Sequence, residues 1–161
     1  MPKPTAAGLL RSLTLAVLLA IAPLAVAEVH TVEVRNLGPD GNRMVFVPGV
    51  VEAEPGDTVR FAFKDMGHNA MNYHPDNRGK PQLVPEGTEA WDSGFLKPGE
   101  TFEVSLEEEG IHHYLCLPHE SQGMVGVIAV GDVDPDAGLK AVKEAGLPGD
   151  AASELGRLYE Q

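Results

Sequence analysis

Residues 116–124, CLPHESQGM, contain three side chains that could bind the same metal ion. Cys116, His119 and Met124 have the spacing Cys-x2-His-x4-Met. Thiolate and thioether sulfurs are soft ligands, and imidazole suits both oxidation states of copper. Two histidines, one cysteine and a weak axial methionine are the ligands of an electron-transferring copper site. The segment therefore predicts three of the four ligands of such a site.

The fourth ligand is expected from a distant strand, and His68 has a suitable position. Gly67-His68-Asn69 follows the strand pattern that ends at Phe63. Each ligand also has a plainer interpretation, because a lone buried cysteine or methionine is usually packing and a lone histidine is usually a surface or core residue. The spacing of three such residues between two strands makes that interpretation the weaker one. Zinc would also enter the site, but an axial methionine is poorly suited to structural zinc.

The remaining histidines are interpreted as surface or core residues: His30, His74, His112 and His113. Of these, His74 is the one whose loop could bring it close to the metal. His112 and His113 are adjacent, and successive residues of a strand point to opposite faces. The pair therefore cannot easily chelate one ion, which argues against the second metal that a small oxidase or reductase would need.

The first 27 residues have the layout of a cleaved secretory signal peptide. A basic start precedes an uncharged apolar run at residues 13–25, and Ala25-Val26-Ala27 offers small residues for cleavage. The mature chain is expected to start at Glu28 and to lie in the periplasm. A retained membrane anchor is the alternative, but the run is short for a bilayer and Pro23 interrupts it. An exported protein with a single unpaired cysteine is unusual, which favours a cysteine held by a metal.

The expected mature chain is strongly acidic. Residues 28–161 hold all 24 acidic residues and ten of the 12 basic ones, a formal net charge of −14. Nucleic acids and anionic membranes are bound by basic surfaces, so the charge argues against both classes of partner. It agrees either with plain solubility or with docking on a basic protein, and both alternatives stay open. No stretch after the leader is apolar enough to span a membrane.

Glycine and proline divide residues 28–132 into short apolar segments, which predicts one β-domain. We expect strands at residues 29–34, 44–47, 50–53, 58–63, 101–106, 111–115 and 124–130. About seven short strands with turns between them predict an antiparallel β-sandwich. Residues 72–82 are polar and rich in turn formers, so they are expected to form a loop.

Residues 133–161 change in composition and predict a helical extension. Asp134 is a suitable N-cap with Pro135 at the first helical position, and a second helix is expected over residues 150–159. Both helices are too short to be stable alone, so we expect them to pack on the sandwich. A disordered tail is the alternative.

The motifs together resemble the pseudoazurins, a family of blue-copper proteins of the cupredoxin class. The resemblance covers nearly the whole mature chain and is carried by Gly67-His68-Asn69, Pro85-Glu86-Gly87, Tyr114-x-Cys116-x-Pro118-His119-x4-Met124 and Ile128-x-Val130-Gly131. It implies an all-β Greek-key cupredoxin sandwich with two short C-terminal helices packed on it.

The resemblance also implies a ligand set for one copper ion. His68, Cys116 and His119 would be the strong ligands, and Met124 the long axial one. Asn69 would tether the two ligand loops and lie near the thiolate sulfur. Two features depart from the family: the span after His68 is longer, with residues 72–82 as the insert, and the ligand loop carries Glu120. Lysines surround the copper end of relatives that serve denitrifying reductases, so nitrite reductase is not expected as the partner.

The resemblance implies a periplasmic one-electron carrier, not an enzyme, whose copper cycles between Cu(I) and Cu(II). His119 would present its ring edge beside Leu117 and Pro118 as the electron port, and redox partner proteins would dock there transiently on a monomer. Three alternatives remain: a copper-delivery or storage protein, a small oxidase or reductase, and a metal-free adhesion module.

Overall fold

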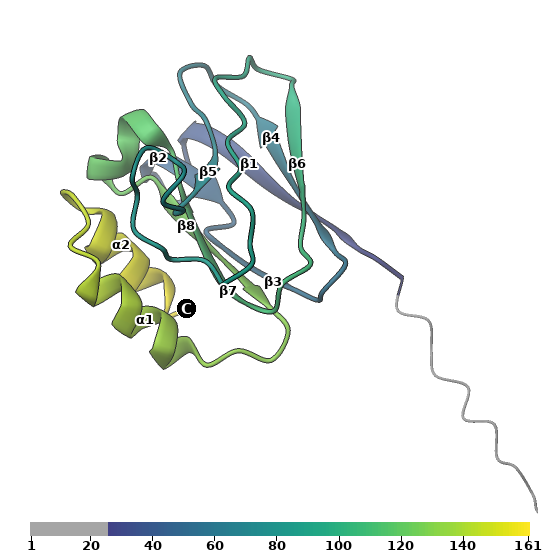
Figure 1. Cartoon of the computed structure of the whole chain (residues 1–161). Helices are drawn as coiled ribbons and strands as arrows, with labels where there is room; N and C mark the ends of the chain where they lie inside the picture. The colour runs from purple at the N-terminus through teal and green to yellow at the C-terminus, as the bar shows by residue number, and fades with distance from the viewer. Residues whose placement is uncertain (1–25) are drawn as a thin grey trace, which may run out of the picture.

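A computed structural model describes residues 26–161, which form two packed β-sheets with two helices against one of them (Figure 1). Of the predicted leader, residues 1–27, only Val26 and Ala27 fall within the described residues, and both are exposed. The strands are β1 (Val29–Leu37), β2 (Arg43–Val47), β3 (Val50–Ala53), β4 (Thr58–Phe63), β5 (Met71–Asn72), β6 (Thr101–Ser105), β7 (Gly110–Leu115) and β8 (Val125–Val130). The helices are the 3-10 helix η1 (Leu117–Gln122), α1 (Pro135–Glu144) and α2 (Ala151–Leu158).

The first sheet has the strand order β2-β1-β4-β6 and turns one apolar face inward. In β4, Val59, Phe61 and Phe63 are buried and the residues between them are half-buried. Because side chains alternate between the two faces of a strand, apolar residues at every second position create one core-facing side. β1 contributes Val32 and Val34 to the same face.

The second sheet has the order β3-β8-β7-β5 and is covered on both faces. One face meets the first sheet, and the other meets α1 and α2 (Figure 1). β8, with the sequence VGVIAV, is therefore buried along nearly its whole length. A strand covered on both faces needs a continuous apolar run instead of an alternating one, and β8 has such a run.

The predicted all-β sandwich with two C-terminal helices is confirmed, but the prediction that it is antiparallel is wrong for two strand pairs. β1 runs parallel to β4, and β3 runs parallel to β8. The reason lies at Pro48-Gly49, between β2 and β3. There the chain passes from the first sheet to the second, so two consecutive strands join different sheets instead of forming a hairpin.

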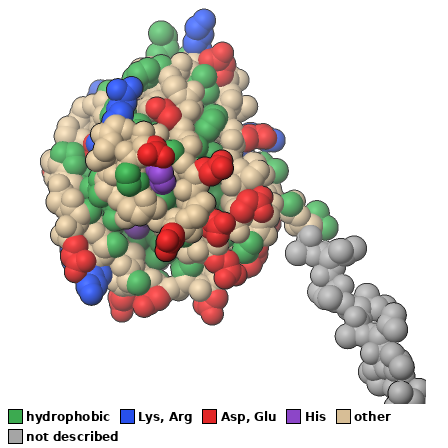
Figure 2. Space-filling model, viewed as in Figure 1, with side chains coloured by type: hydrophobic (Ala, Val, Ile, Leu, Met, Phe, Trp, Pro, Cys, Tyr) green, Lys and Arg blue, Asp and Glu red, His purple; other side chains and the backbone are tan. Residues whose placement is uncertain are grey.

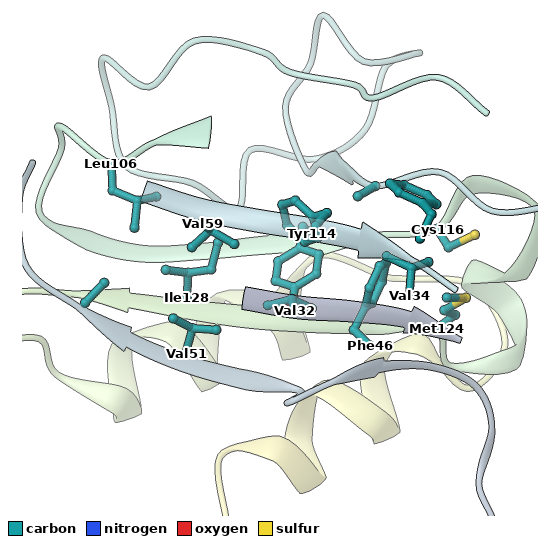
Figure 3. Close-up of a cluster of buried hydrophobic side chains, with 14 of the residues drawn as sticks. Val32, Val34, Phe46, Val51, Val59, Leu106, Tyr114, Cys116, Met124 and Ile128 are labelled. Carbon is teal, nitrogen blue, oxygen red and sulfur yellow. The ribbon is translucent and has the colours of Figure 1, made fainter. Parts of the chain in front are cut away.

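An aromatic cluster fills the space between the sheets, next to the end of β7. The Tyr114 ring lies edge-on to Phe46 and to Phe61, with ring centroids 4.8 and 5.1 Å apart (Figure 3). Edge-on aromatic pairs add to the stabilisation that burial alone provides. Cys116 follows Tyr114 by two residues and belongs to the same buried cluster. The cluster therefore gives the residues after β7 a rigid base.

The C-terminal helices form as predicted and pack on the second sheet. The Asp134 side chain accepts a hydrogen bond from the Asp136 N–H at 3.0 Å and caps α1. Val142 of α1 and Leu155 and Leu158 of α2 are buried against this sheet. None of the helices in residues 26–161 is both long enough and apolar enough to cross a membrane.

Most of residues 72–82 form a loop as predicted, but Asn72 belongs to β5 and is buried. The Asn72 side-chain oxygen accepts hydrogen bonds from the Trp91 N–H at 3.0 Å and from Asn77 Nδ2 at 2.6 Å. Asn77 Nδ2 also contacts the Trp91 carbonyl at 3.0 Å. The loop is therefore anchored to the body of the sandwich through two asparagines.

Two glycines of the helices provide a matched test of how the helices pack. A Cβ at Gly138 of α1 would meet the Tyr159 hydroxyl and lie 2.6 Å from Ile111 Cδ1. Tyr159 cannot move away freely, because its hydroxyl is 2.6 Å from His113 Nε2. We expect Gly138→Ala to destabilise the fold by about 1–3 kcal/mol through overpacking, measured by urea unfolding.

Gly156→Ala in α2 is the control, since its Cβ would have Leu139 Cδ1 at 3.9 Å as its nearest neighbour. This change should stabilise the fold by about 0.5–1 kcal/mol through helix propensity. Equal effects of the two substitutions would contradict the described packing of α1 on the sheet.

Candidate metal centre

The segment between β7 and β8 is held in shape by its own backbone. The Cys116 N–H donates to the Met124 carbonyl at 2.9 Å, and the Met124 N–H donates to the His119 carbonyl at 3.1 Å. Gly123 ends η1 with a φ of 82°, a left-handed conformation that glycine adopts at little cost. Its N–H donates to the Glu120 carbonyl at 2.9 Å. These hydrogen bonds fix the relative positions of the cysteine, the histidine and the methionine.

His68 reaches the same place from the loop after β4. It is fully buried, and its Nε2 lies 2.8 Å from the side-chain oxygen of Asn36, at the end of β1. An amide oxygen only accepts hydrogen bonds, so the His68 proton lies on Nε2 and the Nδ1 lone pair is free. Hydrogen bonds of this kind orient the histidines that bind metals. Sequence analysis missed Asn36, because only the parallel pairing of β1 with β4 brings it near.

Three potential ligand atoms converge between the two loops. His68 Nδ1 lies 3.1 Å from His119 Nδ1, and Cys116 Sγ lies 3.6 Å from the first nitrogen and 3.4 Å from the second. The point equidistant from the three atoms is about 2.0 Å from each, which is the length of a bond from nitrogen to a first-row metal and about 0.3 Å shorter than a bond from sulfur. Within residues 26–161, this is the one group of three histidine, cysteine or acidic side chains with such convergence.

Protonation in the metal-free site follows from its burial. Burial raises the pKa of Cys116 to about 11, against the opposing effect of backbone hydrogen bonds from Asn69 and His119. Burial also lowers the pKa of His68, helped by the nearby His119, and burial lowers the pKa of His119 itself. At neutral pH the site therefore holds a thiol and two neutral imidazoles. Two nitrogen lone pairs and one displaceable proton are what a soft metal cation requires.

Met124 is fully buried in the same core cluster as Cys116. Figure 3 shows the sulfur atoms of both residues at one end of the cluster, beyond Phe46 and Val34. A thioether is a weak and soft donor, so it can act as a fourth contact without competing with the other three atoms. The donor set therefore suits copper better than any hard cation.

Asn69 joins the two ligand loops. Its Oδ1 accepts a hydrogen bond from the Leu117 N–H at 2.7 Å, next to the cysteine. Its Nδ2 donates to Asp92 Oδ1 at 2.9 Å, which anchors the side chain from behind. Asn69 follows His68, and Leu117 follows Cys116. The hydrogen bond between Asn69 and Leu117 therefore helps the core to hold the two ligands in place.

Glu120 is the unexpected feature of the ligand loop, since it follows His119 directly and is only 4% exposed. Its Oε2 forms an ion pair with the Lys80 ammonium group, which comes from the 72–82 loop. The Glu120 carboxylate also lies close to the buried Tyr73 hydroxyl, whose pKa is raised by burial first and by Glu120 second. A buried carboxylate without a cation would be strongly destabilising. The 72–82 loop therefore neutralises this carboxylate of the ligand loop, and Lys80 is a second residue that was not among the predicted site residues.

The other histidines have structural partners. His113 Nδ1 is 2.8 Å from the Leu83 carbonyl, and burial lowers the pKa of His113 to about 4. His112 Nε2 is 2.8 Å from the Glu108 carbonyl. The two residues lie on opposite faces of β7, as expected, because His113 contacts Tyr159 of the helical layer and His112 does not. His74 accepts a hydrogen bond from the Asp76 N–H at 3.1 Å and is absent from the ligand group.

Comparison with known proteins assigns this geometry to a family. The profile described as "Copper binding proteins, plastocyanin/azurin family" matches residues 32–131. Pseudoazurin of Paracoccus pantotrophus is 36% identical over 140 residues, which cover 87% of this chain and 88% of the relative. A putative pseudoazurin of Rhizobium leguminosarum bv. viciae is 38% identical over 133 residues, with 83% and 79% covered.

A solved structure shows the same architecture. Native pseudoazurin of Hyphomicrobium denitrificans superposes with a TM-score of 0.68 at 36% identity, and the match covers 82% of this chain and 96% of that one. The predicted resemblance, the cupredoxin fold and the copper cofactor are thereby confirmed. The chain therefore belongs to the plastocyanin/azurin family of copper-binding proteins, in which it is a pseudoazurin-like cupredoxin.

Proposed function

We propose that the chain is an exported one-electron carrier whose copper ion is held by His68, Cys116, His119 and Met124. The observation that carries the proposal is the triangle of two Nδ1 atoms and one Sγ, with sides of 3.1, 3.4 and 3.6 Å. Copper, when bound, supplies the Cu(I)/Cu(II) couple. The protein would contribute three strong donors, from His68, Cys116 and His119, and one weak donor, from Met124, a set typical of blue-copper sites that transfer electrons.

Each residue around the site has a distinct task. Asn36 keeps the His68 Nδ1 lone pair directed at the ion, and Asn69 keeps the two loops in register. Phe46, Phe61 and Tyr114 form a base that does not rearrange. Since neither the loops nor the base need to move when charge on the ion changes, the reorganisation that accompanies electron transfer stays small.

His119 is the proposed route for electrons between copper and a partner. It is the half-buried member of the ligand group, whereas His68 and Cys116 are fully buried. Pro118 beside it is exposed and Leu117 is half-buried, so the surface around the ring edge is apolar. A small apolar contact suits a transient redox encounter between this monomer and another periplasmic protein. The acidic surface favours a basic partner, and no substrate is transformed.

Copper delivery is the less favoured role. A delivery site must release its ion to a partner, and partner residues must therefore reach the ligands. Three of the ligand side chains are 0% exposed, namely Cys116, His68 and Met124. Backbone hydrogen bonds and the Lys80–Glu120 ion pair hold the ligand loop in one conformation. Such a site retains copper and passes electrons through the exposed edge of one imidazole.

The visible spectrum of the copper-loaded protein tests the proposed ligands. Residues 28–161 with Cu(II) should show a strong thiolate-to-copper charge-transfer band, because the Cys116 sulfur lies within 3.6 Å of both imidazole nitrogens and can bind the same ion. Cys116→Ser and His119→Ala should abolish the band. His74→Gln is the matched control and should keep it, since His74 lies outside the ligand group. A colourless, redox-silent protein would overturn the electron-carrier proposal.

Proton release on copper binding gives an independent test. At pH 7 Cys116 is protonated, because its pKa is raised to about 11, and both ligand imidazoles are neutral, because their pKa values are lowered. Binding should therefore release one proton per copper, measured with an indicator dye in weakly buffered solution. Cys116→Ser should release none. Release of two or more protons would contradict the described protonation of the histidines.

A further inference from the structure

A buried carboxylate lies at the start of the first strand, far from the metal centre. Asp57, in the turn between β3 and β4, is 6% exposed. Its Oδ1 accepts a hydrogen bond from the Glu28 N–H at 2.7 Å, and its Oδ2 contacts the Glu54 N–H and His30 Nε2, each at 2.9 Å. Its backbone pairs with Leu106, which Figure 3 shows at the opposite end of the core from Cys116.

The surroundings of Asp57 favour a cation. Among residues 26–161, His30 is the one side chain that forms an ion pair with Asp57. An imidazole carries a full positive charge only when it is protonated. Backbone hydrogen bonds from Glu54 and Glu28, and then His30, lower the pKa of Asp57 to about 2. The carboxylate is therefore charged at any physiological pH, and a buried charge is usually paired.

A cavity of about 630 Å³ adjoins the Glu28 backbone and is lined by acidic groups. Glu52 and Glu54 face it from β3 and the following turn, and Asp132 faces it from beyond β8. Tyr159 and Gln161 close it on the helical side. The lining includes no lysine or arginine. Figure 2 shows several acidic side chains gathered where the described chain begins. The carboxylates of Glu52, Glu54 and Asp132 are exposed and screened by solvent, so their negative field at the Glu28 nitrogen is weak, and Asp57 is the acidic group in direct contact with it.

We infer that Asp57 is the receptor for the α-ammonium group that processing creates at Glu28; the inference rests on the proposed export of the chain. Hydrolysis of the Ala27–Glu28 peptide bond consumes one water, whose oxygen goes to the Ala27 carbonyl carbon. The products at neutral pH are a carboxylate on Ala27 and an ammonium group on Glu28, so atoms and charge balance. The bond is accessible, because Ala27 and Glu28 are exposed and β1 starts only at Val29.

The new charge needs no rearrangement to find its receptor. The nitrogen that becomes the ammonium group is the one already 2.7 Å from Asp57 Oδ1. The Glu28 carbonyl is fixed as well, since it accepts a hydrogen bond from the Thr58 N–H at 2.8 Å. Processing thus converts a neutral amide donor into a charged one at the same position. The ionised carboxylate already strengthens the hydrogen bond to the amide, and the ammonium group adds the Coulomb attraction of an ion pair, so the processed chain is the more stable form.

The pH dependence of this stabilisation has a defined sign. An α-amino group has an ordinary pKa of about 7.7–8.0, and the carboxylate raises it in the folded state. The added stability is therefore fully present below that ordinary value and is lost as the pH rises through the higher folded value. Asp57 stays ionised over this range, and the other facing carboxylates, Glu52, Glu54 and Asp132, add to the same effect.

Two chains that differ only in the position of the amine provide the test. One begins at Glu28 and the other at Val26. The ammonium group of the second chain therefore lies two residues before the nitrogen that contacts Asp57. At pH 6.5, chemical unfolding should show that the folding equilibrium constant of the Glu28 chain is about tenfold larger than that of the Val26 chain. The advantage should disappear above the raised pKa, and it should vanish in an Asp57→Asn pair. A His74→Gln pair is the control and should keep the advantage, since His74 contacts neither Asp57 nor Glu28.

Equal stability of the two parent chains at pH 6.5 would overturn the inference. If the Asp57→Asn chains do not fold, NMR titration of the Glu28 α-amine in the parent decides instead. A pKa above the ordinary range supports the receptor, and an ordinary value overturns it. The intact mass of the protein recovered from the export compartment separately tests the start at Glu28. A different start would contradict the proposed cleavage but would leave the copper centre untouched.

Discussion

The convergence of two imidazole nitrogens and one thiol sulfur is the constraint on which the site depends. The three atoms come from two loops, and the structure holds them 3.1 to 3.6 Å apart. The two imidazole nitrogens form the closest pair, at 3.1 Å. This arrangement persists because Asn36 orients one ring and the hydrogen-bonded ligand loop orients the other. The fold carries the cost of assembling the site before any metal binds.

The surrounding architecture serves this arrangement from two sides. Aromatic rings between the sheets support Cys116 from within, and Asn69 ties the loop of His68 to the ligand loop. On the outer side, Lys80 of the 72–82 loop neutralises Glu120 next to the half-buried imidazole of His119. The Lys80–Glu120 pair therefore adds no net charge next to His119, although the chain as a whole is strongly acidic.

Local patterns predicted the parts of the structure that are coded locally. The alternation in β4 and the cap at Asp134 are each contained in a few residues, and each led to the correct element. The Cys-x2-His spacing likewise named two of the three side chains that converge. The parallel pairs join residues 29 apart in β1–β4 and 77 apart in β3–β8, and the contacts of Asn36 with His68 and of Lys80 with Glu120 span 32 and 40 residues. Such contacts depend on how the two sheets exchange strands at Pro48-Gly49, which no local pattern reveals.

Preorganisation of the ligands is the central claim, and crystal structures of metal-free and copper-loaded residues 28–161 test it most directly. The distances among His68 Nδ1, His119 Nδ1 and Cys116 Sγ should agree between the two states within about 0.5 Å. A metal-free structure in which the His119 ring has turned away from the sulfur would contradict the claim. Copper, and not the fold, would then assemble the site.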